Sequence, residues 1–125
     1  CDLIITATPS KKPLLKKESL KKGTHITALG SDSPGKQELE HDIFAKADLI
    51  VADSKLQCLE RGEIHHAIKH GIIEEGDVQE LGSLISANEP IYRDEDQITI
   101  ADLTGVAVQD IQIAKAVYEE CERIN

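Results

Sequence analysis

Four short apolar runs constrain the fold of this chain more than any other feature. Each run is rich in Ile, Leu, Val or Thr and ends at small or acidic residues, as buried strands do. The runs are Asp2 to Thr6, His25 to Leu29, Asp48 to Ala52 and Gln97 to Ala101. Segments with helical spacing alternate with strands through much of the chain, and that alternation favours a parallel sheet. The sequence therefore predicts an α/β fold with a mostly parallel sheet of about four strands.

The segments between and after these runs contain the predicted helices. We expect helices at residues 38–47, 55–61, 63–70, 79–87 and 106–122. Asp53 and Ser54 are suited to cap the second of them, and Leu81, Leu84 and Ile85 should point inward from the fourth. The last helix is the longest, and its apolar positions cover a broad face, so we expect it to be buried on more than one side. Residues 88–97 are polar and predict a loop.

The stretch from His25 to Leu39 has the layout of a ligand site. A strand breaks at Gly30-Ser31, places one carboxylate at Asp32, and turns through Ser33-Pro34-Gly35 before Lys36. Pro fixes φ and Gly permits positive φ, so this is a turn signal. Open α/β sheets bind ligands at the carboxyl ends of their strands. The alternative is a plain surface loop whose Asp32 caps the following helix.

The composition of the chain argues against some kinds of binding partner and location. The chain has 125 residues and a net charge of −9, which argues against nucleic acid because phosphate binding needs a basic face. No apolar run approaches the length of a membrane span. The three cysteines lie far apart and predict free thiols in a reducing compartment, hence a cytoplasmic location. The chain has no Met and starts on the edge of a strand, so we expect a piece of a longer protein.

Two clusters of basic or histidine residues are each consistent with either a ligand site or an ordinary solvated surface. Six lysines between residues 11 and 22 form a basic patch that would attract a dinucleotide phosphate or, more simply, a solvated face. His66 and His70 have the i, i+4 spacing of a helical metal pair, but no third ligand accompanies them. We therefore expect no metal site and interpret these histidines as exposed or helix-terminal.

Two stretches carry a resemblance to a known family. Residues 25–39, HITALGSDSPGKQEL, resemble the signature of the ornithine cyclodeaminase/μ-crystallin family, and residues 102–110, DLTGVAVQD, resemble its second signature. Their order and separation also match. Within the family, the sequence GSDSPGKQEL is most similar to the archaeal-type alanine dehydrogenase branch. The chain has no GxGxxG turn, so the resemblance implies that residues 1–125 are the second half of a Rossmann-like, NAD(P)-binding domain from a longer two-domain protein.

The resemblance also implies a set of site residues. Asp32 matches the catalytic acid of the family, and Thr104 would face the substrate. Leu103 stands where relatives often have a small polar residue, which puts one cofactor hydrogen bond in doubt. The implied cofactor is NAD, with NADP as the alternative, because the residue that reads the ribose lies outside this chain. The residues expected to bind the cofactor are Thr6, Ala7, Thr8, His25, Ile26, Thr27, Ala28, Lys36 and Leu103.

Two functions follow as hypotheses. In the first, the chain is the cofactor-domain portion of an enzyme that oxidatively deaminates a small amino acid, reduces the corresponding imino or keto acid, or cyclises ornithine. A carboxylate such as Asp32 would stabilise the developing iminium cation and accept protons. The full-length enzyme would be a homodimer, and the fragment alone would be inactive. In the second, the chain is a non-catalytic, μ-crystallin-like domain for binding or oligomer assembly.

Overall fold

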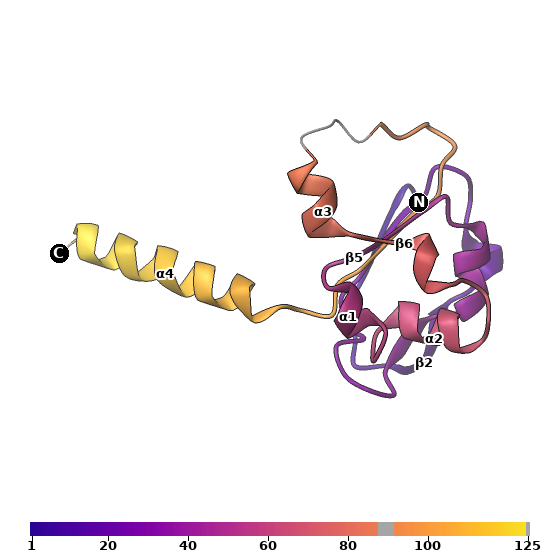
Figure 1. Cartoon of the computed structure of the whole chain (residues 1–125), viewed down its shortest axis with the longest axis horizontal. Coiled ribbons are helices and arrows are strands. Elements are labelled where there is room, and N and C mark those ends of the chain that lie inside the picture. The colour runs from indigo at the N-terminus through magenta and orange to yellow at the C-terminus, as the bar shows by residue number, and fades with distance from the viewer. Residues whose placement is uncertain (88–91, 125) are drawn as a thin grey trace.

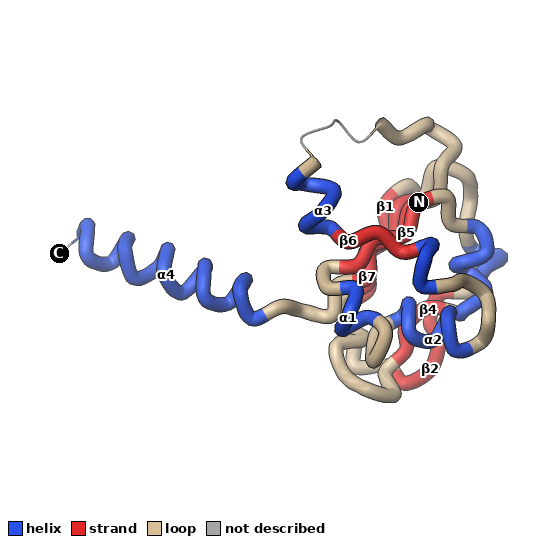
Figure 2. Tube along the Cα trace, viewed as in Figure 1, coloured by secondary structure: helices blue, strands red, loops and turns tan. Residues whose placement is uncertain are grey.

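The computed structural model describes residues 1–87 and 92–124. Its main sheet has five strands in the order β1-β3-β7-β5-β6, and every neighbouring pair is parallel. Figure 2 shows these strands gathered in the body of the molecule. The strands are β1 (Leu3–Thr6), β3 (His25–Ala28), β5 (Leu49–Ala52), β6 (Val78–Glu80) and β7 (Thr99–Asp102). The predicted α/β class, the four predicted strands and their parallel pairing are therefore confirmed.

Helices and a second small sheet complete the described chain. Two further strands, β2 (Lys11–Leu15) and β4 (Gln37–Leu39), pair with each other in parallel. The α-helices are α1 (Lys55–Cys58), α2 (Glu63–Lys69), α3 (Leu81–Ser86) and α4 (Ala107–Ile124). The 3₁₀ helices are η1 (Lys17–Ser19), η2 (His41–Lys46) and η3 (Glu75–Asp77). No helix within the described residues is both long and apolar enough to span a bilayer.

The core lies on one face of the main sheet. Ile26, Ile100 and Ile50 are neighbours in the strand register, and none is more than 4% exposed. Side chains of α2 and η2, including Ile64 and Phe44, pack against them in one apolar cluster. The other face is open at the edge strand β1, where Leu3 and Ile5 are more than half exposed. The sheet is thus covered by helices of this chain mainly on one side.

The predicted helix at residues 38–47 is wrong. Residues Gln37 to Leu39 form β4 instead, and only the 3₁₀ helix η2 follows. The backbone N–H of Gln37 donates to Ser10, and those of Glu38 and Leu39 donate to the Glu63 side chain. These long-range partners replace the i to i+4 bonds that a helix would have required.

The region from residue 78 to 97 also departs from expectation. Val78 begins a fifth strand, β6, which was too short to be recognised from its pattern. The following helix, α3, starts at Leu81 rather than at residue 79, and Ile85 is 70% exposed instead of pointing inward. The predicted polar loop agrees with the loop at residues 92–97, while residues 88–91 lie outside the described part of the chain.

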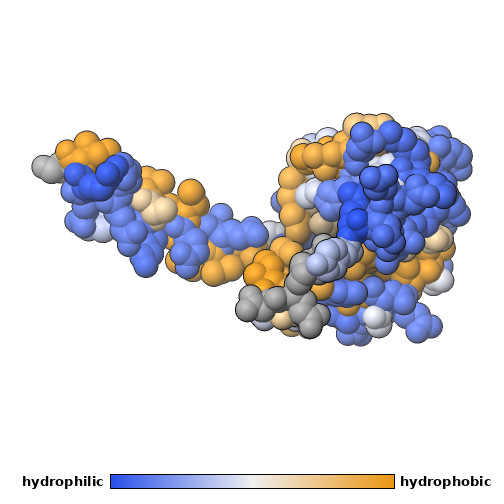
Figure 3. All heavy atoms as spheres, turned by 90° about the horizontal axis from the view of Figure 1, so that it is seen from above, coloured by the Kyte–Doolittle hydropathy of each residue, from blue (hydrophilic) through white to orange (hydrophobic). Residues whose placement is uncertain are grey.

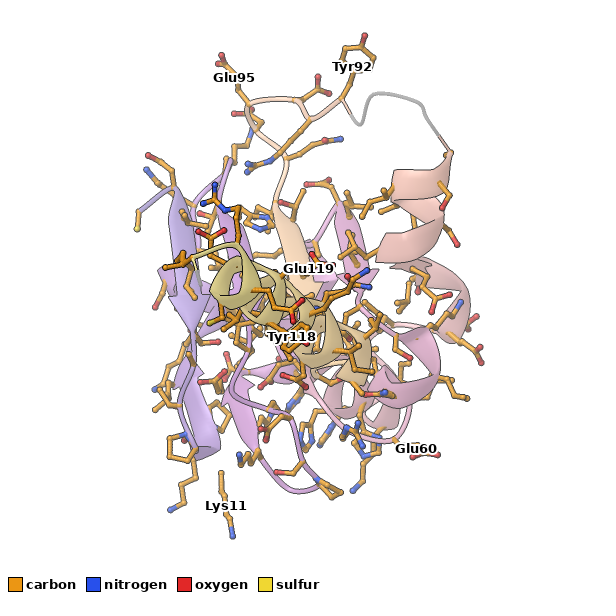
Figure 4. All side chains as sticks on the ribbon, turned by 90° about the vertical axis from the view of Figure 1, so that its left-hand side faces the viewer. Lys11, Glu60, Tyr92, Glu95, Tyr118 and Glu119 are labelled. Carbon is orange, nitrogen blue, oxygen red and sulfur yellow. The ribbon has the colours of Figure 1, made fainter. Side chains whose placement is uncertain are left out.

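The long C-terminal helix forms as predicted, but its predicted burial is wrong. Helix α4 projects away from the body of the molecule (Figure 1), and none of its residues is buried. Figure 3 shows apolar side chains on its surface, interleaved with hydrophilic ones. In Figure 4 the helix comes toward the viewer in front of the sheet, with Tyr118 and Glu119 on its outer turns. A broad apolar face favours burial only where a neighbouring element is available, and the described chain brings none to α4.

Candidate active site at the carboxyl edge

The carboxyl ends of three strands place most of the predicted site residues at one edge of the sheet. Thr6, Ala28 and Asp102 are partners in the register of β1, β3 and β7, so the loops that follow them emerge together. These loops contain the predicted residues Ala7, Thr8, Asp32, Lys36, Leu103 and Thr104. The strand ends and loops also touch, since the N–H of Leu29 donates to the carbonyl of Thr6 at 2.7 Å and that of Leu103 to Ala28 at 2.9 Å.

Strand β3 brings only its last residue to this edge. His25 is at the opposite end of the strand, about 10 Å from Ala28 at the usual rise per residue. Its ring contacts the hydroxyls of Thr99 and Thr27, at 2.6 and 3.1 Å, and its pKa is lowered, first by burial and then by the charge of Arg93. Ile26 is fully buried and faces the core. The side chains of residues 25–27 therefore lie away from the group formed by the strand ends.

Asp32 is an exposed carboxylate at this edge. Its side chain is 55% exposed, and its Oδ1 accepts hydrogen bonds from Lys36 Nζ at 2.6 Å and from Ser33 Oγ at 3.0 Å. These donors hold the pKa of Asp32 below its usual range, with Lys36 contributing most. Asp32 is consequently ionised at neutral pH. It has the charge needed to stabilise a cation and an accessible position from which to do it.

The turn after Asp32 is anchored from inside the protein. Gly35 has a φ of +80°, and the N–H of Lys36 donates to Ser33 at 3.3 Å, which confirms the predicted turn. The carbonyl of Lys36 accepts from the buried Ser31 hydroxyl at 2.7 Å and from His66 Nε2 at 2.8 Å. His66 thus ties the turn to helix α2. Within residues 1–87 and 92–124, no three His, Cys, Asp or Glu side chains are grouped as metal ligands.

Three buried carboxylates lie beneath these loops, and sequence reasoning did not identify them as part of the site. Glu38 and Glu63 are fully buried, and Asp102 is 1% exposed. Burial raises the pKa of Glu63 to about 7 and that of Asp102 to about 8, although backbone N–H donors oppose both shifts. Acidic residues beside a turn or at a predicted helix start are normally solvated. Nothing in their spacing therefore distinguished these three from surface residues.

Thr104 is held inside the protein. It is 4% exposed, and its hydroxyl lies 3.2 Å from both Asp53 Oδ1 and Gln57 Oε1. Asp53 also accepts the N–H groups of Ser54 and Gly105, both at 2.8 Å. Ser54 occupies the predicted N-cap position of α1, but its side chain makes no capping hydrogen bond. Asp53 therefore connects the end of β5 to the segment that leads into α4.

The Thr6 hydroxyl is a buried polar group that makes no hydrogen bond within the described residues. Ala7, the next residue, is small and exposed. An unpaired buried hydroxyl normally has a bound partner or a cost in free energy. This strand end is therefore suited to accept a polar ligand.

Comparison with known proteins places these features in a family. The family model for the ornithine cyclodeaminase/mu-crystallin family matches residues 1–125. The alanine dehydrogenase of Archaeoglobus fulgidus is 44% identical over 120 residues, which cover 95% of this chain and 37% of that protein. The chain thus spans well under half of that relative's length.

Two solved structures are also similar. The structure of an archaeal alanine dehydrogenase dimer with bound NAD is 44% identical, with a TM-score of 0.90 over 100% of this chain and 39% of its own. That of the iminosuccinate reductase of Paracoccus denitrificans in complex with NAD⁺ is 41% identical, with a TM-score of 0.89 over 98% of this chain and 38% of its own.

Proposed function

This chain belongs to the ornithine cyclodeaminase/mu-crystallin family, and from that premise we propose that it forms part of the NAD-binding domain of an amino-acid oxidoreductase. The reaction would be oxidation of a small amino acid or reduction of the corresponding imino or keto acid. The similarity to an alanine dehydrogenase and an iminosuccinate reductase supports this class of substrate. A homodimer, in keeping with the dimer of the archaeal alanine dehydrogenase, and a cytoplasmic location belong to the same proposal.

The observation that carries the proposal is the connection between the Asp32 loop and the turn at Thr6 to Thr8. The two segments share the Leu29 to Thr6 backbone bond and a common acceptor, the Glu38 side chain. An ionised, exposed carboxylate is therefore held beside a strand end that offers an unpaired hydroxyl. A plain connecting loop would need neither feature.

The residues at this edge fit a nicotinamide cofactor. The unpaired Thr6 hydroxyl offers a hydrogen bond, and the small Ala7 leaves room for close approach to the backbone. Thr8, Ala28, Lys36 and Leu103 would complete the surface around it. The cofactor, when bound, supplies the hydride acceptor or donor.

The chemistry required of the protein falls on Asp32. Removal of hydride from an amino acid leaves a cationic iminium group, and a carboxylate aimed at that group stabilises the charge as it develops. Asp32 would also accept a proton from the substrate amine or from the water that attacks the iminium carbon. Lys36 lowers the pKa of Asp32, because its ammonium group favours the charged form of the carboxyl.

Replacement of Asp32 tests this function in the whole protein that contains the chain. Asp32→Asn keeps the size of the side chain but removes its charge, so we expect kcat to fall by roughly 10²- to 10⁴-fold. The affinity for NADH, measured by fluorescence titration, should stay near its wild-type value. The matched control is Asp96→Asn, which breaks an exposed Lys22 ion pair of similar length, 2.7 Å, outside the carboxyl edge. Near wild-type turnover of Asp32→Asn would refute the assignment.

A further inference from the structure

Glu38 connects two loops of the site from a strand that belongs to neither. Its Oε1 accepts the N–H of Thr8 at 2.5 Å, and its Oε2 accepts the N–H of Gly30 at 2.9 Å. Thr8 follows β1, whereas Gly30 follows β3 and lies two residues before Asp32. The two oxygens of one carboxylate therefore span the turn that would line the cofactor and the loop that holds the acid.

The burial of Glu38 means that its oxygens need hydrogen-bond donors from the protein. The side chain is fully buried, and a carboxylate is tolerated there only when donors satisfy its oxygens. The backbone N–H groups of Thr8 and Gly30 satisfy one oxygen each. A neutral residue would suffice if β4 were needed only for packing. The two loops are accordingly held by two backbone hydrogen bonds to one buried side chain.

Gly30 brings the loops to their closest approach at the same place. A Cβ added there would lie 2.2 Å from the carbonyl oxygen of Thr8 and 2.5 Å from Glu38 Cδ. The absence of a side chain therefore lets the Asp32 loop lie directly against the Thr8 turn. A change of about an ångström in this spacing would break a bond to Glu38.

A second carboxylate fixes Glu38 in place. Glu63 Oε1 accepts the N–H of Glu38 at 2.7 Å, and its Oε2 accepts that of Leu39 at 3.0 Å. Glu63 begins α2, whose next N–H, that of Ile64, donates to Asp102 Oδ2 at 2.8 Å. The helix is thereby tied to the end of β7. Glu38 is thus attached to a rigid part of the fold and cannot follow a loop that moves.

We propose that Glu38 is a positioning residue, which sets the distance between the Thr6 to Thr8 turn and the Asp32 loop and so aligns the acid with the reacting atoms. This inference rests on the proposed function of Asp32. Glu38 itself is fully buried and does not touch the substrate. It acts through the two backbone N–H groups that it holds, because misplacement of reacting groups by an ångström is enough to slow a reaction about 100-fold.

The variant that tests the proposal is Glu38→Gln in the whole protein. The amide keeps the volume but has one oxygen, and its NH₂ group faces an N–H donor, so one of the two loops is released. We expect kcat to fall about 10- to 100-fold. With NADH deuterated at C4, the isotope effect on kcat should rise toward its intrinsic value, because hydride transfer becomes slower relative to the other steps. Simple loss of folded protein would lower the rate and leave the isotope effect unchanged.

The control is Glu40→Gln, two residues further along. Glu40 accepts the N–H of Lys17 at 3.0 Å and holds neither loop, so its variant should keep the wild-type kcat and isotope effect. If Glu38→Gln does not fold, Glu38→Asp retracts the carboxylate by one methylene and tests the same spacing. Wild-type kcat and isotope effect in the folded Glu38 variant would overturn the positioning role.

The Asp32→Asn variant separates this inference from the function on which it rests. If Asp32→Asn is inactive while the Glu38 variant behaves as wild type, the positioning role fails and the proposed function stands. If Asp32→Asn retains full turnover, the proposed function fails, and the inference about Glu38 is overturned with it.

Discussion

Gly30→Ala should destabilise the protein strongly although it adds one methyl group. The new Cβ would lie 2.2 Å from the Thr8 carbonyl oxygen, whereas ordinary contact begins at 3.4 Å, so the loops must separate by about 1.2 Å. Overpacking of this kind costs about 1–3 kcal/mol. Leaving a buried oxygen of Glu38 without its hydrogen bond costs about 1–3 kcal/mol more. The stiffer unfolded chain returns about 0.4–1 kcal/mol, which leaves a net loss of roughly 1–5 kcal/mol.

Urea denaturation of the whole protein measures this loss from the shift in midpoint at constant slope. The matched control is Gly82→Ala, which lies in α3 with nothing within 4 Å of its added Cβ. Gly82 is the second residue of α3, where the helix propensity of alanine counts for less than in an interior, so that variant should gain at most about 0.5–1 kcal/mol. A loss of less than about 0.5 kcal/mol for Gly30→Ala, the range of ordinary surface changes, would refute the close contact between the two loops.

Two further predictions concern charge. Because burial raises the pKa of Glu63 to about 7 and of Asp102 to about 8, the folded state binds protons more tightly than the unfolded state. Protonation therefore stabilises the fold most below the normal carboxyl pKa values, and this contribution is lost as pH rises through 7 and 8. The free energy of unfolding should fall from pH 5 to pH 8.5 by on the order of 6 kcal/mol, and Asp102→Asn should flatten that slope in urea titrations; an equally steep slope in the variant would contradict the assignment. Lys36→Met should let the pKa of Asp32 rise and move the acidic limb of the kcat/KM profile to higher pH, and an unmoved limb would show that Lys36 does not control Asp32.

The strands of the fold were accessible from the sequence because their information is local. Runs such as Leu49 to Ala52 combine β-branched residues with sharp ends, and the structure places a strand at each of the four predicted runs. β2, β4 and β6 were missed. β4 and β6 have three residues each, β2 is mostly exposed and rich in lysine, and β2 pairs with β4 and β6 with β5 across long stretches of chain. The burial of α4 was overestimated for a related reason. An apolar face shows that a helix can pack but does not identify the surface against which it packs.

The site also contains features set by local sequence and features set by long-range contacts. The turn at residues 33–35 and its Lys36 could be predicted, because Pro and Gly restrict the backbone locally and the carboxylate precedes them. The role of Glu38 could not, since its two donors lie 30 and 8 residues away and its burial depends on the complete fold. The catalytic role of Asp32 and the contacts expected of Thr6, Leu103 and Thr104 remain predictions for the experiments above.

The exposure of α4 has a consequence for the cooperativity of unfolding. Lys115 pairs with Glu119 and Arg123 with Glu120 within this helix, and none of its residues is buried. Such exposed pairs stabilise a helix only weakly. The helix and the sheet therefore form two units of very different stability, and α4 would lose its amide protection and its helicity well before the sheet unfolds. In the isolated chain, the helical circular dichroism signal of α4 would be lost on heating in a transition of its own, separate from the unfolding of the sheet that carries Asp32.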